Sequence, residues 1–437
     1  MAQKIQNKIN LIIKEFQDGN LEVAEKLAIN FKDKYPKNDF GWRLLGIIYA
    51  NTNRYEEALE VNQKAIKISP NDAALYLNLG HVLIKLGRFY DSSKSLKQAI
   101  KLKPDFAEAF SNLGFALKER GLLEESEKNL RKAIALDPNQ PQSHNNLGLT
   151  LKDQAKIEEA KKSLIKAIDL RADYDIAFWN LAGLTKEIND AEHWIDKCLI
   201  ANKNHLEANL IKAAFLYYKG NKEKYNQLSD SKFKNHPYMR SFSWVFNLPN
   251  LPQLYFNKWH FFESISKMTI KSRPFYEFGV WRGASFNYLI KFYEKGFGFD
   301  TFTGLPEDWD VGNIMEKSGS YSADGIVPEV KGGEFIMGKF EDSLPVFFSQ
   351  ERPVASLVNF DSDLFSSTIC ALNYSKKIID KDTILIFDEF LINENWEQDE
   401  YKALEKFCFQ NNFSYEVLAI SFFSKQVAVK LTEKKDV

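Results

Sequence analysis

The 437-residue sequence has few cysteines, few histidines and almost no net charge. Its three cysteines, Cys198, Cys370 and Cys408, are far apart and fit neither a disulfide framework nor a zinc motif. The 58 basic residues nearly balance the 59 acidic ones, so no overall charge favours nucleic acid or an anionic membrane. No apolar run approaches the ~18 residues of a membrane span, and the N-terminus lacks an apolar signal region. We therefore expect a cytoplasmic protein with no membrane span and no nucleic-acid partner.

The first half of the chain contains a repeat with a period of 34 residues, the interval from Gly46 to Gly80. Glycines, alanines and prolines recur at this interval through four consecutive units. Small residues let paired helices cross closely, and a proline ends the second helix of each pair. The pattern resembles the tetratricopeptide repeat. This resemblance places full repeats at 39–72, 73–106, 107–140 and 141–174, with a partial unit before them and degenerate helices after them.

The repeat resemblance implies an all-α solenoid domain over residues 1–229, in which stacked helices share one core. Proteins of this family often bind a peptide or a partner protein in the concave groove, so we expect a protein or peptide partner here. Asn78, Asn112 and Asn146 each precede a column glycine and are predicted to face the groove. The alternatives are a structural spacer or a self-association surface that builds a homo-oligomer.

The second half is organised around the run from Phe275 to Ser285, which predicts a buried strand, a turn and a helix reaching about residue 295. Gly279 and Gly283 permit a tight turn and a close approach to a ligand. Asp300 ends a second apolar strand, where an acid can accept hydrogen bonds from ribose hydroxyls. The dinucleotide motif G-x-G-x-x-G is absent, which disfavours a dehydrogenase, the alternative nucleotide-using enzyme.

The spacing Glu277-x-Gly279-x-x-x-Gly283 resembles the first motif of class I S-adenosylmethionine-dependent methyltransferases. The sequence from Phe299 to Trp309 resembles the macrocin O-methyltransferase family, which methylates sugar hydroxyls, and this likeness extends over 272–392. The resemblance implies an α/β, doubly wound, Rossmann-like domain over 240–437 that binds S-adenosylmethionine. The implied cofactor-binding residues are Glu277, Gly279, Gly283, Ser285, Asp300 and Asp342. A helix N-cap is the alternative role for Asp342.

Acidic residues also follow two later predicted strands. Asp361 and Asp363 come after the strand over 354–360, and Asp388 and Glu389 come directly after the strand over 383–387. Because the carboxyl ends of parallel strands meet at one edge of a sheet, these acids are expected to converge. Converging carboxylates repel one another unless a cation lies among them, and hard oxygen ligands suit Mg²⁺.

This layout resembles the macrocin family and catechol O-methyltransferase. The resemblance implies that Asp361, Asp388 and Glu389 bind Mg²⁺. Asp361 and Asp363 are the implied catalytic residues, and Asp363 is a general base, an acceptor ligand or a support for its loop. We expect Mg²⁺-assisted transfer of a methyl group from S-adenosylmethionine to a hydroxyl of a sugar or glycoconjugate, free or carrier-bound. Trp309 and residues 319–325 are expected to form a mobile cover. The alternative is an interaction protein whose methyltransferase-like domain is inactive.

Overall fold

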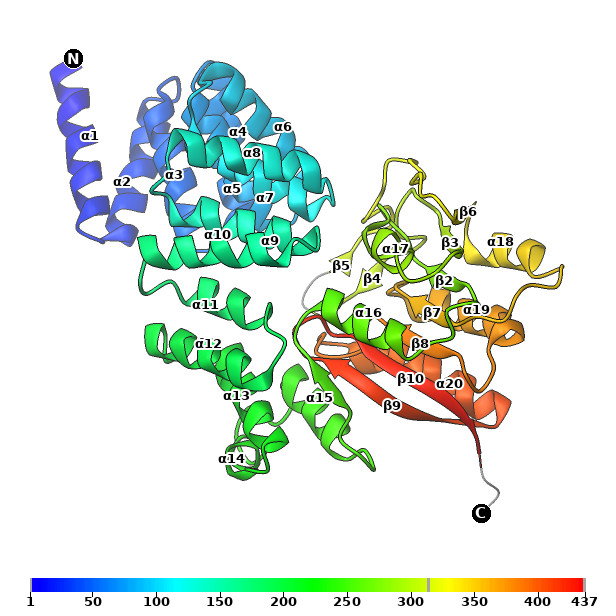
Figure 1. Cartoon of the computed structure of the whole chain (residues 1–437). Coiled ribbons are helices and arrows are strands. Elements are labelled where there is room, and N and C mark those ends of the chain that lie inside the picture. Colours follow the sequence, from blue (N-terminus) through cyan, green and yellow to red (C-terminus); the bar gives the residue numbers. More distant parts are fainter. Residues whose placement is uncertain (1, 313–314, 435–437) are drawn as a thin grey trace. The chain divides into compact units, whose positions relative to one another are not determined.

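The computed structural model describes residues 2–312 and 315–434, and the chain divides into two compact units, Met1–Arg171 and Ala172–Val437 (Figure 1). The predicted domain boundary at residue 229 coincides with the end of a helix, but the compact units divide near residue 171 instead. The helices between these two positions therefore belong with the C-terminal sheet. None of the helices in residues 2–312 and 315–434 combines the length and the apolar composition that a membrane span requires.

The first unit consists of antiparallel helix pairs. Helices α3, α5, α7 and α9 begin at intervals of 34 residues, at Asp39, Ala73, Ala107 and Pro141, so the predicted repeat boundaries are confirmed. The helices of this unit are α1 (Ala2–Gln17), α2 (Leu21–Lys34), α3 (Asp39–Asn51), α4 (Tyr55–Ile68), α5 (Ala73–Lys85), α6 (Phe89–Leu102), α7 (Ala107–Glu119), α8 (Leu123–Leu136), α9 (Pro141–Asp153) and α10 (Ile157–Leu170).

The glycine column marks the closest approach of the two helices in each pair. A Cβ atom added to Gly114 would lie 2.4 Å from Cγ of Leu130 on the second helix of its pair. Gly80 and Gly148 have the same relation to the leucine sixteen residues later, at 2.6 and 2.7 Å. Buried leucines thus fill the space that a side chain on the first helix would need, which explains the period of the small residues.

The predicted asparagine ladder is only partly supported. Asn78 and Asn112 are half-buried and stay candidates for a groove surface. Asn146 is buried and accepts a hydrogen bond from Nε2 of Gln142, one helical turn earlier, at 3.1 Å. The prediction that Asn146 faces an open groove is therefore wrong, because its side chain is already enclosed.

The second unit begins with helices and continues into a mixed α/β region. The helices before the sheet are α11 (Asp175–Ala182), α12 (Ile188–Ala201), α13 (Leu206–Tyr218), α14 (Glu223–Ser229) and α15 (Pro237–Phe246). The remaining elements are β1 (Gln253–Tyr255), α16 (Lys258–Lys267), β2 (Phe275–Phe278), α17 (Ala284–Leu289), β3 (Gly296–Asp300), β4 (Trp309–Asp310), β5 (Met315–Glu316), β6 (Gly333–Met337), α18 (Phe340–Phe347), β7 (Leu357–Phe360), α19 (Phe365–Ser375), η1 (Lys376–Ile378), β8 (Ile384–Phe387), η2 (Trp396–Gln398), α20 (Glu400–Asn411), β9 (Phe413–Ser421) and β10 (Val427–Glu433).

The main sheet has the order β1-β9-β10-β8-β7-β2-β3-β6. Strands β8, β7, β2, β3 and β6 are parallel, and β10 is antiparallel to both of its neighbours, so the predicted final hairpin is confirmed. From β2 the chain first moves outward to β3 and β6, and then crosses back to β7 and β8. The direction of winding therefore changes between β2 and β7, which places a topological switch point at their carboxyl ends.

The change in winding direction also determines which face of the sheet each helix covers. Right-handed crossovers place helices on opposite faces of a parallel sheet when the strand order reverses. Accordingly, α16 contacts α17, while α18, α19 and α20 contact one another in sequence. Helix α17 ends at Leu289, so the predicted helix to about residue 295 is too long.

The turn between β9 and β10 packs against the preceding helices. Phe422 lies edge-on to Phe242 of α15, and Phe423 contacts Trp179 of α11, each with ring centroids 4.8 Å apart. Phe256, after β1, meets Phe215 of α13 at 5.6 Å. These contacts explain why residues 172–246 form one unit with the sheet.

Candidate active site

The glycine turn after β2 is held in a left-handed backbone conformation, with φ of +91° at Gly279 and +79° at Gly283. A Cβ atom at Gly279 would lie 1.7 Å from the backbone oxygen of Asp361. The tight turn is therefore as predicted, but the group that approaches Gly279 closely is the chain's own backbone after β7. This contact fixes the ends of β2 and β7 against each other at the switch point.

Asp300 at the end of β3 binds the glycine turn. Its Oδ2 accepts hydrogen bonds from the backbone N–H groups of Val280 and Trp281, each at 2.7 Å. Its Oδ1 accepts from the N–H of Phe302 at 2.6 Å. The predicted ribose ligand is thus the residue that shapes the turn, and a ribose contact would use the remaining acceptor positions of the same carboxylate.

Glu277 is fully buried on β2, between Gly298 of β3 and Asn359 of β7. Neither of its carboxyl oxygens has a hydrogen-bond partner among the described residues. Burial, followed by the nearby Asp361, raises the pKa of Glu277 well above its ordinary value. Buried carboxyl groups without a partner are rare in proteins, so Glu277 is a candidate for binding a polar ligand.

Ser285 and Asp342, the other two predicted cofactor ligands, lie on different helices. Ser285 is buried in the first turn of α17, directly after Gly283 and Ala284. Asp342 is exposed in the first turn of α18, where Lys339 holds the N-cap position. The N-cap alternative for Asp342 is therefore wrong, and a contact of Asp342 with the adenine ring stays a prediction.

The acids after β7 and β8 do converge, and Lys258 lies between them. Nζ of Lys258 is 3.4 Å from Oδ2 of Asp361 and 3.0 Å from Oδ1 of Asp388. Burial alone would lower the pKa of Lys258, but Asp361 and Asp388 outweigh it and raise this pKa. Lys258 begins α16, whose N-cap residue Asn257 accepts a hydrogen bond from the N–H of His260 at 2.8 Å.

A second lysine binds the remaining predicted metal ligand. Nζ of Lys425, in the β9–β10 turn, is 2.8 Å from Oε2 of Glu389 and 2.6 Å from Oδ1 of Asn393. The neighbouring Gln426 donates from Nε2 to Oδ1 of Asp388 at 2.5 Å. Each of the three predicted metal ligands is therefore held by a side chain of the protein itself.

The predicted Mg²⁺ site does not fit this arrangement. No group of three or more histidine, cysteine, aspartate or glutamate side chains has metal-binding geometry within residues 2–312 and 315–434. Asp361, Asp388 and Glu389 lie near one another, but each of them pairs with the ammonium group of Lys258 or Lys425. The acids have the predicted position at the sheet edge and different partners from those expected.

Asp363 and Glu400 extend the acidic cluster. Asp363 has φ of +60°, a conformation that is uncommon outside glycine and often marks functional positions. Burial, and then Asp361, raise the pKa of Asp363 well above its ordinary value. Glu400 is fully buried at the start of α20, and its Oε2 accepts from the N–H of Glu389 at 3.1 Å. No sequence motif predicted four of these residues, because isolated charged or polar residues in a helix or turn form no pattern: Lys258, Glu400, Lys425 and Gln426.

The residues predicted to form a mobile cover, Trp309 and 319–325, are packed against the rest of the domain. Trp309 is buried, and its Nε1 donates to Oδ2 of Asp399 at 3.2 Å, so it is not an exposed lid residue. Tyr321 meets the ring of Trp281 edge-on at 6.0 Å, and Asp324 pairs with Arg282 at 2.8 Å. Residues 319–325 thus contact the glycine turn, as a cover over this turn would.

The burial of Asp399 predicts a pH dependence of stability. Burial raises the pKa of Asp399 to about 6. The folded carboxyl group therefore binds a proton at a pH where the unfolded one has lost it, so stability falls as pH rises from about 4 to about 6. We expect the Asp399→Asn protein, which keeps an acceptor for Trp309, to lose about 1–3 kcal/mol less over this range than the wild type. Urea unfolding across the pH range measures the difference, and parallel curves for both proteins would contradict the shifted pKa.

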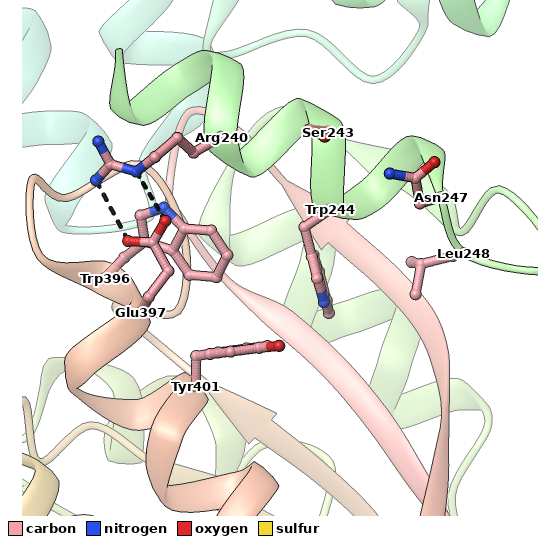
Figure 2. Close-up of a pocket in the computed structure, with 8 residues that line it drawn as sticks. All are labelled: Arg240, Ser243, Trp244, Asn247, Leu248, Trp396, Glu397 and Tyr401. Atoms are coloured by element: carbon pink, nitrogen blue, oxygen red, sulfur yellow. Dashed lines mark hydrogen bonds and ion pairs between the residues drawn. The ribbon is translucent and has the colours of Figure 1, made fainter. Parts of the chain in front are cut away.

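A pocket of about 410 Å³ lies beside the segment that follows β8 (Figure 2). Figure 2 shows Arg240 of α15 facing Glu397, with the rings of Trp244, Trp396 and Tyr401 beside them. Nε of Arg240 donates to Oε1 of Glu397 at 2.7 Å. Nε1 of Trp396 is buried and has no hydrogen-bond partner among the residues that the structure describes. The other lining residues are Ser243, Asn247 and Leu248.

Family models identify the first unit. Residues 46–87, 80–121 and 116–155 match the model described as TPR repeat, and residues 141–174 match the tetratricopeptide repeat model. Residues 46–174 are tetratricopeptide repeats. The matched ranges coincide with the regular helix pairs, so the solenoid predicted for this part of the chain is confirmed. Tetratricopeptide repeats indicate a role in protein interaction or as a scaffold.

Solved structures resemble the tetratricopeptide part of the chain. YrrB, described as a TPR protein with an unusual peptide-binding site, is 25% identical, with 39% of this chain and 88% of YrrB covered and a TM-score of 0.34. PilF of Pseudomonas aeruginosa is 18% identical, with coverage of 49% and 98% and a TM-score of 0.42. A thermophilic TPR protein of Thermus thermophilus is 22% identical, with coverage of 41% and 100% and a TM-score of 0.38. These TM-scores are too low to carry an argument. No curated protein matches the chain.

Proposed function

We propose that the second unit is an S-adenosylmethionine-dependent O-methyltransferase that acts on a hydroxyl of a sugar or glycoconjugate. The observation that carries this proposal is the gathering of Asp361, Asp363 and Asp388 with the buried Glu277 at the carboxyl ends of β2, β7 and β8. In doubly wound α/β domains, ligands bind in the crevice at this switch point. The order of the parallel strands agrees with such a Rossmann-like domain.

The residues around the glycine turn are compatible with bound S-adenosylmethionine. Glu277 has two buried oxygens without partners, and the indole N–H of Trp281 is also buried without one among the described residues. Such groups gain hydrogen bonds when a polar ligand binds. In this proposal the turn binds the amino acid part of the cofactor, and Asp300 contacts its ribose as well as the turn.

Asp363 is the proposed general base. When bound, S-adenosylmethionine supplies a sulfonium methyl group whose bonding electron pair stays on sulfur as an oxygen–carbon bond forms. Asp363 takes the proton that the acceptor hydroxyl loses in this transfer. Its raised pKa makes its carboxylate a stronger base than an exposed aspartate. Lys258 keeps Asp361 and Asp388 in place, and the proposed transfer uses no metal ion, because the three predicted metal ligands are held by other side chains.

The pocket beside β8 is the proposed place for the acceptor. A sugar has apolar C–H faces and polar hydroxyl edges, so rings such as Trp244 and Tyr401 together with the charged pair Arg240 and Glu397 match its surface. Trp244 also contacts Phe390, two residues beyond Asp388, at 5.5 Å between ring centroids. The tetratricopeptide repeats would dock a protein or peptide partner, or a carrier that bears the acceptor.

One observation favours a second candidate, an interaction protein whose methyltransferase-like domain is inactive. Asp300, Asp361, Asp388 and Glu389 all have partners within the chain, as in a domain stabilised by its acids. Cofactor binding distinguishes the two candidates, because an inactive domain of this kind need not bind S-adenosylmethionine.

The test is calorimetric titration of S-adenosylhomocysteine into the full-length protein. We expect binding that Asp300→Asn weakens by about tenfold or more, because this change removes an acceptor from the turn and from the ribose. Asp382→Asn is the matched control, since Asp382 lies beyond the amino end of β8, at the opposite edge of the sheet. Absence of binding to the folded wild-type protein would overturn the enzyme proposal and favour the interaction protein.

A further inference from the structure

We infer that Lys258 and Lys425 serve as built-in cations that replace a divalent metal ion among the acids after β7 and β8. The inference deepens the proposed function, because it concerns how the same site holds its carboxylates. It rests on ion pairs and burial, and it can be tested without any cofactor or substrate.

The two ammonium groups are distributed over all three acids. Lys258 contacts Asp361 and both oxygens of Asp388, within 3.0 to 3.4 Å, and the side chain of Lys258 is only 25% exposed. Lys425 contacts Glu389 at 2.8 Å. An ammonium group has three N–H donors and one positive charge, so the two lysines balance two of the three negative charges that these carboxylates can carry.

Both lysines are held in place from outside the acid cluster. Asn257, next to Lys258, caps α16 and also donates from Nδ2 to the backbone oxygen of Thr185 at 3.2 Å. Lys425 follows Phe422 and Phe423, whose rings pack against α15 and α11. Both lysines are therefore positioned by the packing of the residues beside them.

A metal ion at this place would have to displace these ammonium groups. It would bind within a few ångströms of one or two fixed positive charges, and such like-charge contacts strongly disfavour binding. The lysines therefore both order the acids and exclude the metal.

The experiment is a titration of Mn²⁺, a paramagnetic probe for Mg²⁺ sites, into the full-length protein, with free Mn²⁺ measured by electron paramagnetic resonance. We expect the wild type to bind no stoichiometric Mn²⁺ at millimolar concentration. Lys258→Ala is expected to bind one equivalent, at least about tenfold more tightly than the wild type, because the repelling charge is gone. Adding Asp361→Asn to Lys258→Ala is expected to abolish the new binding.

Lys267→Ala is the matched control, since Lys267 is an exposed lysine on the same helix that pairs only with Glu263 among the described ion pairs. It is expected to behave as the wild type. Stoichiometric binding to the wild type that Asp361→Asn removes would overturn the inference, as would a folded Lys258→Ala protein that binds no Mn²⁺. If Lys258→Ala does not fold, Lys258→Met combined with Asp388→Asn removes both members of the ion pair together. The Mn²⁺ titration of the wild-type protein still tests the inference in that case. The result of the Mn²⁺ titration does not depend on whether the protein binds S-adenosylmethionine.

Discussion

Gly279→Ala is expected to lower the free energy of unfolding of the second unit by about 3–5 kcal/mol. The new Cβ atom would lie 1.7 Å from the backbone oxygen of Asp361, so the contact between β2 and β7 has to open. The neighbouring backbone cannot move freely, because Asp300 binds the N–H groups of Val280 and Trp281. The φ of +91° adds strain for any residue with a side chain.

Gly319→Ala separates the cost of the steric contact from the cost of the backbone strain. Gly319 has φ of +87°, close to that of Gly279, but an added Cβ there would meet nothing within 4 Å. Its cost is expected to be the backbone strain alone, about 1–2 kcal/mol. Urea unfolding followed by circular dichroism compares the two proteins. Equal costs for both substitutions would show that the close approach of Asp361 to Gly279 is not tight.

The repeat array was predictable because its information is local. A glycine faces a leucine in three of the four full repeats and an asparagine, Asn62, in the first, and the glycine recurs every 34 residues, so the pattern appears repeatedly in the sequence. The parallel strands were also predictable, because β2, β7 and β8 are short, fully buried runs of mostly apolar residues. Their acids follow directly, so their convergence was predictable from the strand ends.

The partners of those acids were not predictable. Lys258 and Lys425 are separated from Asp361 by 103 and 64 residues in sequence, and nothing distinguishes them from the other basic residues of the chain. Their contacts depend on how α16 and the β9–β10 turn pack, which is a property of the folded unit. A ligand was predicted to approach Gly279 closely, but the backbone after β7 does so instead. This contact was not predictable either, because that backbone reaches the turn only once the sheet has formed. The sequence therefore predicts where these acids lie, and tertiary packing determines which side chains they contact.

A fragment that begins at residue 172 is expected to fold cooperatively, whereas one that begins at residue 235 is expected to be largely unfolded. The shorter fragment loses α11 and α13, whose Trp179 and Phe215 contact Phe423 and Phe256. It also loses the backbone oxygen of Thr185 that Asn257 binds.

Burying one large apolar side chain stabilises a protein by about 1.5–3 kcal/mol, so losing several such contacts consumes most of a typical domain's ~5–15 kcal/mol of stability. Urea unfolding of both fragments tests this. Phe423→Ala in the full-length protein is the corresponding single change, and it is expected to cost about 1–3 kcal/mol, because Phe423 is half-buried. Phe409→Ala is its control, because Phe409 on α20 is 84% exposed and its removal is expected to be nearly neutral. Equal urea midpoints for the two fragments would mean that α11–α14 contribute nothing to the sheet. A higher midpoint for the longer fragment would place these helices in the unit that holds Lys258 and Lys425 against the acids.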